Sequence, residues 1–190
     1  MTDKPFSFWT SQNTAASFSE PGACQARATA FEKKIRRRNV IEYAAGGLVI
    51  VLFGAMAVMA ASVGEWLFAA AGIAIGLAAI FVIAKLHRDG SAQPRVPEQS
   101  CREHLRAQLV RQRDLLRGVP KWYLAPFVPG LLGFYLVVTA KVAEVQGWTV
   151  AIDGVWLKVA GTAAFFVFVG WLNLYAAKKI DREIGALDRA

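Results

Sequence analysis

Residues 43–64 read YAAGGLVIVLFGAMAVMAASVG and contain no charged side chain. After Glu65, a second uncharged run, WLFAAAGIAIGLAAIFVIA, fills residues 66–84. A helix rises 1.5 Å per residue, so about 20 such residues cross the hydrocarbon core of a bilayer, which is about 30 Å thick. The two runs therefore predict two membrane-spanning helices joined by a short turn.

Two further uncharged runs, at residues 122–140 and 159–177, bring the number of predicted spans to four. Aromatic rings such as Trp66 and Trp122 lie at the ends of the runs, where the headgroup zone of a bilayer favours them. The runs lack the polar stripe that helices of a soluble bundle keep. The 190-residue chain, 55% hydrophobic, is therefore predicted to be an all-α membrane protein with four transmembrane helices.

The distribution of charge predicts the orientation of the spans. The chain has a formal net charge of +8, and 20 of its 22 Lys and Arg lie before the first span, between the second and third, or after the fourth. Only Lys141 and Lys158 lie in the remaining long connection. Basic residues are enriched on the cytoplasmic side, so the N and C termini are predicted to lie inside. The first run begins too late for a cleavable signal peptide, so all four spans are expected to persist.

The first of two predicted cytoplasmic amphipathic helices covers residues 23–41. Ala26, Ala30, Phe31 and Ile35 recur there at helical spacing. The helix ends in a basic cluster directly before the first span. Such a cluster attracts anionic lipid at about 1 kcal/mol per residue, although it can also act only as a topology signal. Five candidate lipid or partner contacts follow: Lys33, Lys34, Arg36, Arg37 and Arg38.

The second amphipathic helix is predicted within the middle loop. Ser100 and Glu103 have the spacing of a capping box, and Gly118 followed by Pro120 is a stop signal. An apolar stripe between them could lie on the membrane, pack on the first amphipathic helix or dock a partner. The stripe consists of Leu105, Leu109, Leu116 and Val119, and the candidate contacts on its basic side are Arg106, Arg113 and Arg117.

These features divide the chain into six segments. Residues 1–22, rich in Ser, Thr, Ala, Asn and Gln, are expected to form a flexible cytoplasmic segment. The remaining segments are the amphipathic helix 23–41, transmembrane hairpin 42–86, the cytoplasmic loop 87–121 with its helix, transmembrane hairpin 122–177 and the cytoplasmic tail 178–190.

Within the spans, small residues and prolines indicate how the helices meet and bend. Gly72 and Gly76 form a GxxxG pattern, which allows close helix packing either inside the bundle or in a homodimer. Pro126 and Pro129 predict a kink in the third span. The centres of the four runs hold no ionisable side chain, which argues against a proton relay, an ion-coupled transporter core or an intramembrane hydrolase.

The sequence predicts no catalytic, cofactor or metal site and therefore no enzyme. Cys24 and Cys101 are the two cysteines, and their predicted cytoplasmic location argues against a disulfide. The two histidines, His87 and His104, are too few and too dispersed to suggest a metal site. No phosphate-binding loop, nucleophile elbow or nucleic-acid-binding module is recognisable.

Two groups of motifs carry a resemblance. Arg36-Arg37-Arg38-Asn39 precedes Glu42-Tyr43, and Arg111-Gln112-Arg113-Asp114-Leu115-Leu116 leads to Trp122-Tyr123, Pro126 and Pro129-Gly130. Over residues 30–136 the chain resembles a family of small, uncharacterised four-span inner-membrane proteins from proteobacteria. The resemblance implies a location in the bacterial inner membrane and supplies no activity, cofactor or site.

The sequence therefore favours a non-enzymatic inner-membrane protein that presents a basic helical surface to the cytoplasm, in a scaffold or regulatory role. Anionic membrane lipids or a cytoplasmic protein partner would bind that surface, and a homo-oligomer is a further option; no nucleic acid is expected. The alternative is a small transporter or channel component, suggested by the kinked span and the glycine-rich helices.

Overall fold

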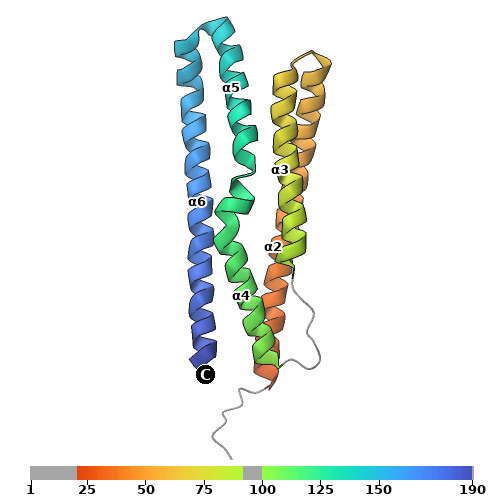
Figure 1. Ribbon diagram of the computed structural model, residues 1–190, viewed down its shortest axis with the longest axis vertical. Helices are drawn as coiled ribbons and strands as arrows, with labels where there is room; N and C mark the ends of the chain where they lie inside the picture. Colours follow the sequence, from red (N-terminus) through yellow and green to blue (C-terminus); the bar gives the residue numbers. More distant parts are fainter. Residues whose placement is uncertain (1–20, 92–99, 190) are drawn as a thin grey trace, which may run out of the picture.

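The computed structural model describes residues 21–91 and 100–189, and these ranges are helical except at short turns. They contain no strand. Figure 1 shows the helices as long rods that run nearly parallel or antiparallel. In chain order the elements are α2 (Pro21–Ser62), α3 (Trp66–Gly90), α4 (Cys101–Val119), the π-helical turn η1 (Pro120–Leu124), α5 (Phe127–Gln146) and α6 (Trp148–Arg189).

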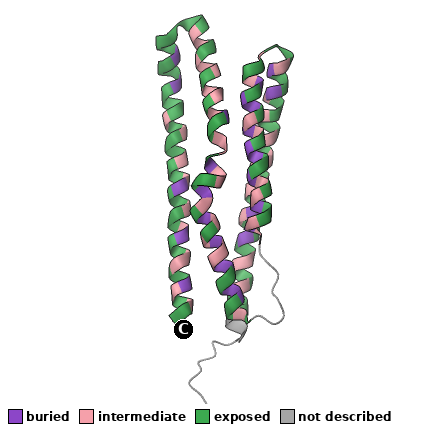
Figure 2. Cartoon of the chain, viewed as in Figure 1, coloured by how far each residue is buried: buried purple, intermediate pink, exposed green. Residues whose placement is uncertain are grey.

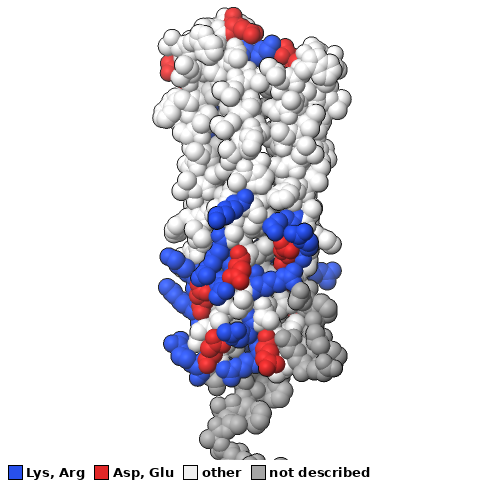
Figure 3. Space-filling view, in the orientation of Figure 1, with Lys and Arg blue, Asp and Glu red and all other residues white. Residues whose placement is uncertain are grey.

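Four helical stretches are long and apolar enough to cross a membrane, which confirms the predicted all-helical class with four candidate spans. They are Gln25–Ser62, Trp66–Gly90, Cys101–Gln146 and Trp148–Arg189. Figure 3 shows charged side chains gathered over one half of the molecule, an uncharged half, and a small charged group at the far end. At the turn between α2 and α3, Glu65 forms an ion pair with Lys141 of α5 at 2.8 Å. Exposed apolar side chains such as Val51, Leu136 and Val167 cover the uncharged half, as a bilayer-facing surface requires.

Several predicted boundaries do not interrupt the helices. The first amphipathic segment and the first span form one continuous helix, α2, and the fourth span and the tail form α6. Residues 141–158, the connection between the third and fourth uncharged runs, are helical except at Gly147. Gly147 has φ +85°, a conformation that glycine adopts without steric cost. One residue therefore makes the turn between α5 and α6.

The connection from α4 to α5 stays close to helical. The α-helix ends at Val119, as the stop signal predicts, but Pro120 keeps a right-handed conformation at φ −55° and ψ −35°. Proline at this φ removes one backbone donor without reversing the chain, and the Ala125 N–H bonds instead to the Pro120 carbonyl at 3.1 Å. The interruption falls at Ala125 and Pro126, whereas Pro129 lies in the first turn of α5, where its missing N–H would have no helical partner.

The helices pack on one another in chain order, except that α4 is absent from the row. In the uncharged half, α2 packs on α3, α3 on α5 and α5 on α6, while α4 packs mainly on α6 in the charged half. Figure 1 shows the first turn of α2, the start of α4 and the end of α6 at the same end of the bundle. Buried residues follow narrow seams between helices (Figure 2), and in the uncharged half many are small, such as Ala57, Ala69 and Ala79.

Candidate functional site

The predicted basic contacts on α4 are used inside the molecule. Arg106 holds Asp188 of α6 through two bonds, Nε to Oδ1 at 2.7 Å and Nη2 to Oδ2 at 3.2 Å. Arg117 Nη2 lies 2.5 Å from Asp181 Oδ2, and Arg113 Nη1 lies 3.4 Å from Oδ1 of the same carboxylate. These three arginines therefore tie α4 to α6.

The basic residues on α2 differ from the arginines of α4 because most of them have no partner in the described parts of the chain. Lys33, Lys34, Arg36 and Arg37 are exposed, and within residues 25–91 and 100–189 they form no ion pair or hydrogen bond. At 3.6 residues per turn, Lys33 and Arg37 lie on the side of α2 opposite buried Ile35, and Lys34 and Arg36 flank it. We call these four residues the α2 basic strip. It leaves uncompensated positive charge just before the first uncharged run.

Side chains from α2 and α4 cap the end of α3. Asn39 Nδ2 and Gln112 Nε2 donate to the Gly90 carbonyl at 3.0 and 3.3 Å, and Arg111 donates to the carbonyls of Asp89 and Arg88, each at 2.9 Å. The last carbonyls of a helix lack intrahelical partners and carry partial negative charge. Sequence reasoning missed this cap. The feature of the sequence that could have indicated the cap is Gln112, a polar residue on the apolar stripe of α4.

A small core stabilises the charged half beside this cap. Leu105 and Leu109 of α4 pack on Ile184 of α6, and buried His104 places Nε2 3.3 Å from Glu32 Oε1 on α2. The apolar stripe of α4 is thus covered by α6, with α2 alongside. The capping box at Ser100 and Glu103 is present, which confirms that prediction.

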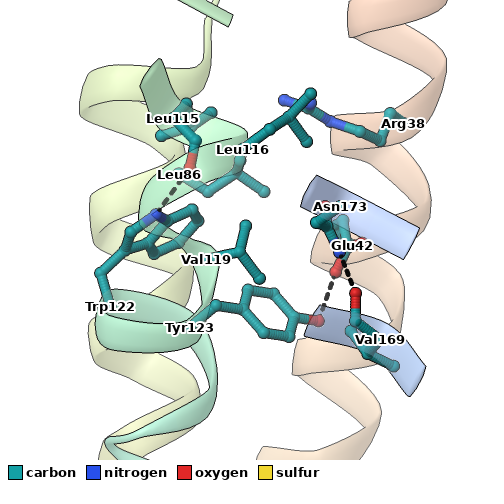
Figure 4. Close-up of a pocket in the computed structure, with 10 residues that line it drawn as sticks. All are labelled: Arg38, Glu42, Leu86, Leu115, Leu116, Val119, Trp122, Tyr123, Val169 and Asn173. Atoms are coloured by element: carbon teal, nitrogen blue, oxygen red, sulfur yellow. Dashed lines mark hydrogen bonds between the residues drawn. The ribbon is translucent and has the colours of Figure 1, made fainter. Parts of the chain in front are cut away.

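The ten residues in Figure 4 surround a cavity between α2, α4 with η1, and α6, to which α3 adds Leu86. Its accessible volume is about 60 Å³, room for about four water molecules. We call it the boundary cavity because two lining residues mark run boundaries: Glu42 directly precedes the first uncharged run and Trp122 begins the third. Six lining residues are apolar or largely apolar: Leu86, Leu115, Leu116, Val119, Trp122 and Val169.

Four polar side chains line the remainder of the boundary cavity. Tyr123 donates its hydroxyl proton to Glu42 Oε2 at 2.6 Å, and Asn173 Nδ2 donates to the Val169 carbonyl at 2.8 Å (Figure 4). Arg38 lies one turn from Glu42 on α2, and its Nη2 contacts Asn39 Oδ1 at 3.2 Å. Burial lowers the pKa of Arg38, which nearby Glu42 partly offsets. Sequence reasoning treated Arg38 as an exposed contact and did not bring these four groups together.

The two predicted helix-packing glycines, Gly72 and Gly76, have different surroundings. A Cβ atom on Gly72 would lie 3.1 Å from the Phe53 carbonyl oxygen on α2, whereas one on Gly76 would meet open space. A third glycine, Gly130 on α5, makes the closest approach: its Cβ would lie 2.9 Å from the backbone nitrogen of Ile75 on α3. Gly72 therefore packs inside the bundle and Gly76 does not.

One expectation about cysteine was wrong. Cys101, the first residue of α4, is disulfide-bonded, whereas the predicted cytoplasmic location argued against a disulfide. The sequence argument relied on the redox state of a compartment and had no access to distances between sulfur atoms. The side chain of Cys24 and residues 1–20 of the predicted flexible segment 1–22 lie outside the described residues. The last two residues of that segment, Pro21 and Gly22, are helical and begin α2, so the prediction was wrong for them.

Comparisons with protein-family models, with curated proteins and with solved structures find no match to this chain. Its fold and composition define an all-helical protein with four helices that could span a membrane. The resemblance of its motifs to a proteobacterial family stays a prediction, so function is argued from the residues alone.

Proposed function

We propose that this is a non-enzymatic integral protein of a bacterial inner membrane that binds anionic lipid headgroups on the α2 basic strip. The observation that carries the proposal is the contrast between two sets of basic residues. Those of the strip are exposed and without intramolecular partners in the described ranges, whereas Arg106, Arg113 and Arg117 pair with α6. The protein would act as a scaffold or regulator that holds the bundle of α2, α4 and α6 against the membrane.

The proposed orientation places both termini in the cytoplasm. Its support is the concentration of 20 of 22 basic residues at one end of the uncharged runs and the gathering of charge over one half of the molecule (Figure 3). Fusion of green fluorescent protein or alkaline phosphatase after residue 190 tests it. A fluorescent, phosphatase-inactive C terminus is expected, and an active phosphatase would contradict the orientation.

The strip lies within reach of lipid headgroups. At 1.5 Å per residue, Arg37 and Lys33 lie about 8 and 14 Å along the helix axis from Glu42, which directly precedes the first run. These distances are comparable with the Debye length of about 8–10 Å at physiological salt, and both side chains are long. If each of the four charges contributes about 1 kcal/mol, the strip contributes about 4 kcal/mol to binding an anionic surface.

Lipid enrichment in nanodiscs tests the proposed function. The protein is reconstituted in a mixture of phosphatidylglycerol and phosphatidylcholine, extracted gently, and its retained lipids are counted by native mass spectrometry. The wild type is expected to enrich phosphatidylglycerol. A strip variant (Lys33→Gln, Lys34→Gln, Arg36→Gln, Arg37→Gln) should lose most of this enrichment.

The matched control changes basic residues that already have partners. Arg106→Gln, Arg113→Gln and Arg117→Gln weaken the contact between α4 and α6 but should leave lipid enrichment in place. Equal enrichment by wild type and strip variant would overturn the proposal. A cytoplasmic protein that co-purifies with the wild type and not with the strip variant, without lipid enrichment, would instead assign the strip to a protein partner.

The alternative function, a small transporter or channel component, has the boundary cavity as its structural support. That cavity lies at one end of the uncharged runs and holds only about 60 Å³, so it offers less support than the strip offers for lipid binding. Solute flux into liposomes that contain the purified protein would revive the alternative.

A further inference from the structure

We propose that the boundary cavity binds the headgroup of a phospholipid that carries a primary ammonium group, the ethanolamine type. The proposal starts from two opposite charges on one helix face. Arg38 and Glu42 lie one turn apart on α2, are both partly buried and line the same cavity. Side chains at this spacing have Cβ atoms about 5–6 Å apart, a separation suited to a phosphate and an ammonium joined by two carbon atoms.

The two charges do not neutralise each other directly. Arg38 and Glu42 form no ion pair with one another, although both belong to the described residues. Figure 4 shows the Arg38 side chain extending toward α4, while Glu42 contacts Tyr123. A cavity with separated positive and negative ends is complementary to a zwitterion, and less so to a group that carries a single charge.

The negative end of the cavity matches the donors of a primary ammonium. Such a group has three N–H donors and no acceptor. Glu42 offers its carboxylate. Tyr123 gives its proton to Glu42 and so retains an acceptor oxygen, and Asn173 donates Nδ2 to Val169, which leaves its Oδ1 as an acceptor. Three acceptors from α2, η1 and α6 therefore line one cavity.

The positive end suits a phosphate. Arg38 uses one of its five N–H donors for Asn39 Oδ1, and the guanidinium fork binds phosphate oxygens through paired hydrogen bonds. The apolar walls formed by Leu116, Val119 and Trp122 exclude water, which strengthens such charge-assisted bonds.

The position and the size of the cavity favour a lipid over a soluble molecule. The cavity lies where the uncharged runs begin, at the level expected for headgroups, and α2 does not pack along α6, so a lipid can lie against the seam between these two helices. An accessible volume of about 60 Å³ admits an ethylammonium group while the phosphate stays at the mouth. The cavity includes no residue of the α2 basic strip, so this proposal and the proposed function can fail independently.

A choice between headgroups tests the proposal. The full-length protein is reconstituted in nanodiscs that contain equal amounts of phosphatidylethanolamine and phosphatidylcholine, and retained lipids are counted by native mass spectrometry. The choline ammonium carries three methyl groups and has no N–H donor. The wild type is expected to retain the ethanolamine lipid at least fivefold over the choline lipid.

Variants then connect the preference to the cavity. Glu42→Gln and, separately, Asn173→Leu should each bring the ratio close to one, and Arg38→Gln should lower retention of both lipids. Glu183→Gln, the same change at an exposed residue of α6, should leave the ratio unchanged. The thermal unfolding midpoint of each variant identifies any misfolding, and Asn173→Leu, nearly equal in volume, provides the test if Glu42→Gln does not fold.

Three results would overturn the proposal. Equal retention of the two lipids by the wild type would show that the cavity does not select the ethanolamine headgroup. An unchanged preference in both Glu42→Gln and Asn173→Leu would place the lipid elsewhere. Displacement of the lipid by millimolar soluble glycerophosphoethanolamine would assign the cavity to a soluble ligand.

Discussion

Gly130 on α5 permits the closest helix approach in the described bundle, and its replacement by alanine should separate α5 from α3. The new Cβ would lie 2.7 Å from Ile75 Cγ1 and 2.9 Å from the Ile75 backbone nitrogen. Carbon atoms in favourable contact lie about 3.5–4.0 Å apart, so the helices would have to move by roughly 1 Å. Ile75 is only 2% exposed, and a backbone atom cannot move aside as a flexible side chain can.

The size of the effect follows from a matched substitution on the same helix. Overpacking of a buried contact costs about 1–3 kcal/mol, while glycine to alanine in a helix gains up to about 1 kcal/mol of intrinsic propensity. A Cβ on Gly133 would lie 3.6 Å from Ala71 Cβ, an ordinary contact, so Gly133→Ala has the gain without the clash. The propensity gain cancels between the two variants, and Gly130→Ala should be less stable than Gly133→Ala by about 1–3 kcal/mol.

Reversible unfolding in mixed micelles measures this difference. The purified variants are titrated with sodium dodecyl sulfate in a mild detergent, and loss of tertiary structure is followed by tryptophan fluorescence. Gly130→Ala should unfold at a lower denaturant fraction than Gly133→Ala. Equal midpoints would refute the argument that α3 and α5 meet at Gly130.

Three further predictions concern the charged half. Ser100→Ala removes the capping box with Glu103 and should cost about 1 kcal/mol of local helix stability, seen as faster amide hydrogen exchange in the first turn of α4 but not in its last. Arg111→Gln removes the bonds to the last carbonyls of α3 and should speed exchange of the amides that precede Gly90. Arg106 lowers the pKa of Asp188 below its ordinary value. The contribution of this pair is therefore complete above the ordinary carboxyl pKa and lost as the pH falls through the lowered value. Protection of the amides at the end of α6, measured against their intrinsic exchange rate at each pH, should therefore fall below pH about 4; Asp188→Asn should show the lower protection already at neutral pH.

The sequence predicts the four long apolar helices well, because a helix able to cross a bilayer must have a minimum length and an apolar composition, and both can be read from the sequence. It predicts helix ends poorly. A charged residue such as Glu42 marks a change of environment, but a helix continues through it unless the backbone itself is altered. Residues 36–45 contain neither Pro nor Gly, and α2 accordingly continues through the predicted boundary.

The candidate sites were less predictable because they depend on contacts between residues distant in sequence. Arg106 and Arg117 resemble the residues of the α2 basic strip in composition, yet their partners lie 82 and 64 residues further along the chain. Arg38 and Glu42 read as ordinary flanking charges until Tyr123 and Asn173 are brought to the same cavity. Periodicity identifies the face of a helix on which a residue lies, but it does not identify the neighbour that covers that face.

The pairing of charges also changes how the net charge of +8 acts on its surroundings. A simple count assigns the charge to the whole charged half of the molecule, but Asp181 and Asp188 compensate much of the positive charge on α4. The uncompensated charge of the strip lies on α2, at one side of the bundle. Because the field of exposed charges decays within about 10 Å at physiological salt, anionic lipids should gather beside α2 and not in an even ring. Spin labels near the ends of α2 and α6 should therefore report different local lipid compositions, and equal enrichment at both positions would contradict this asymmetry.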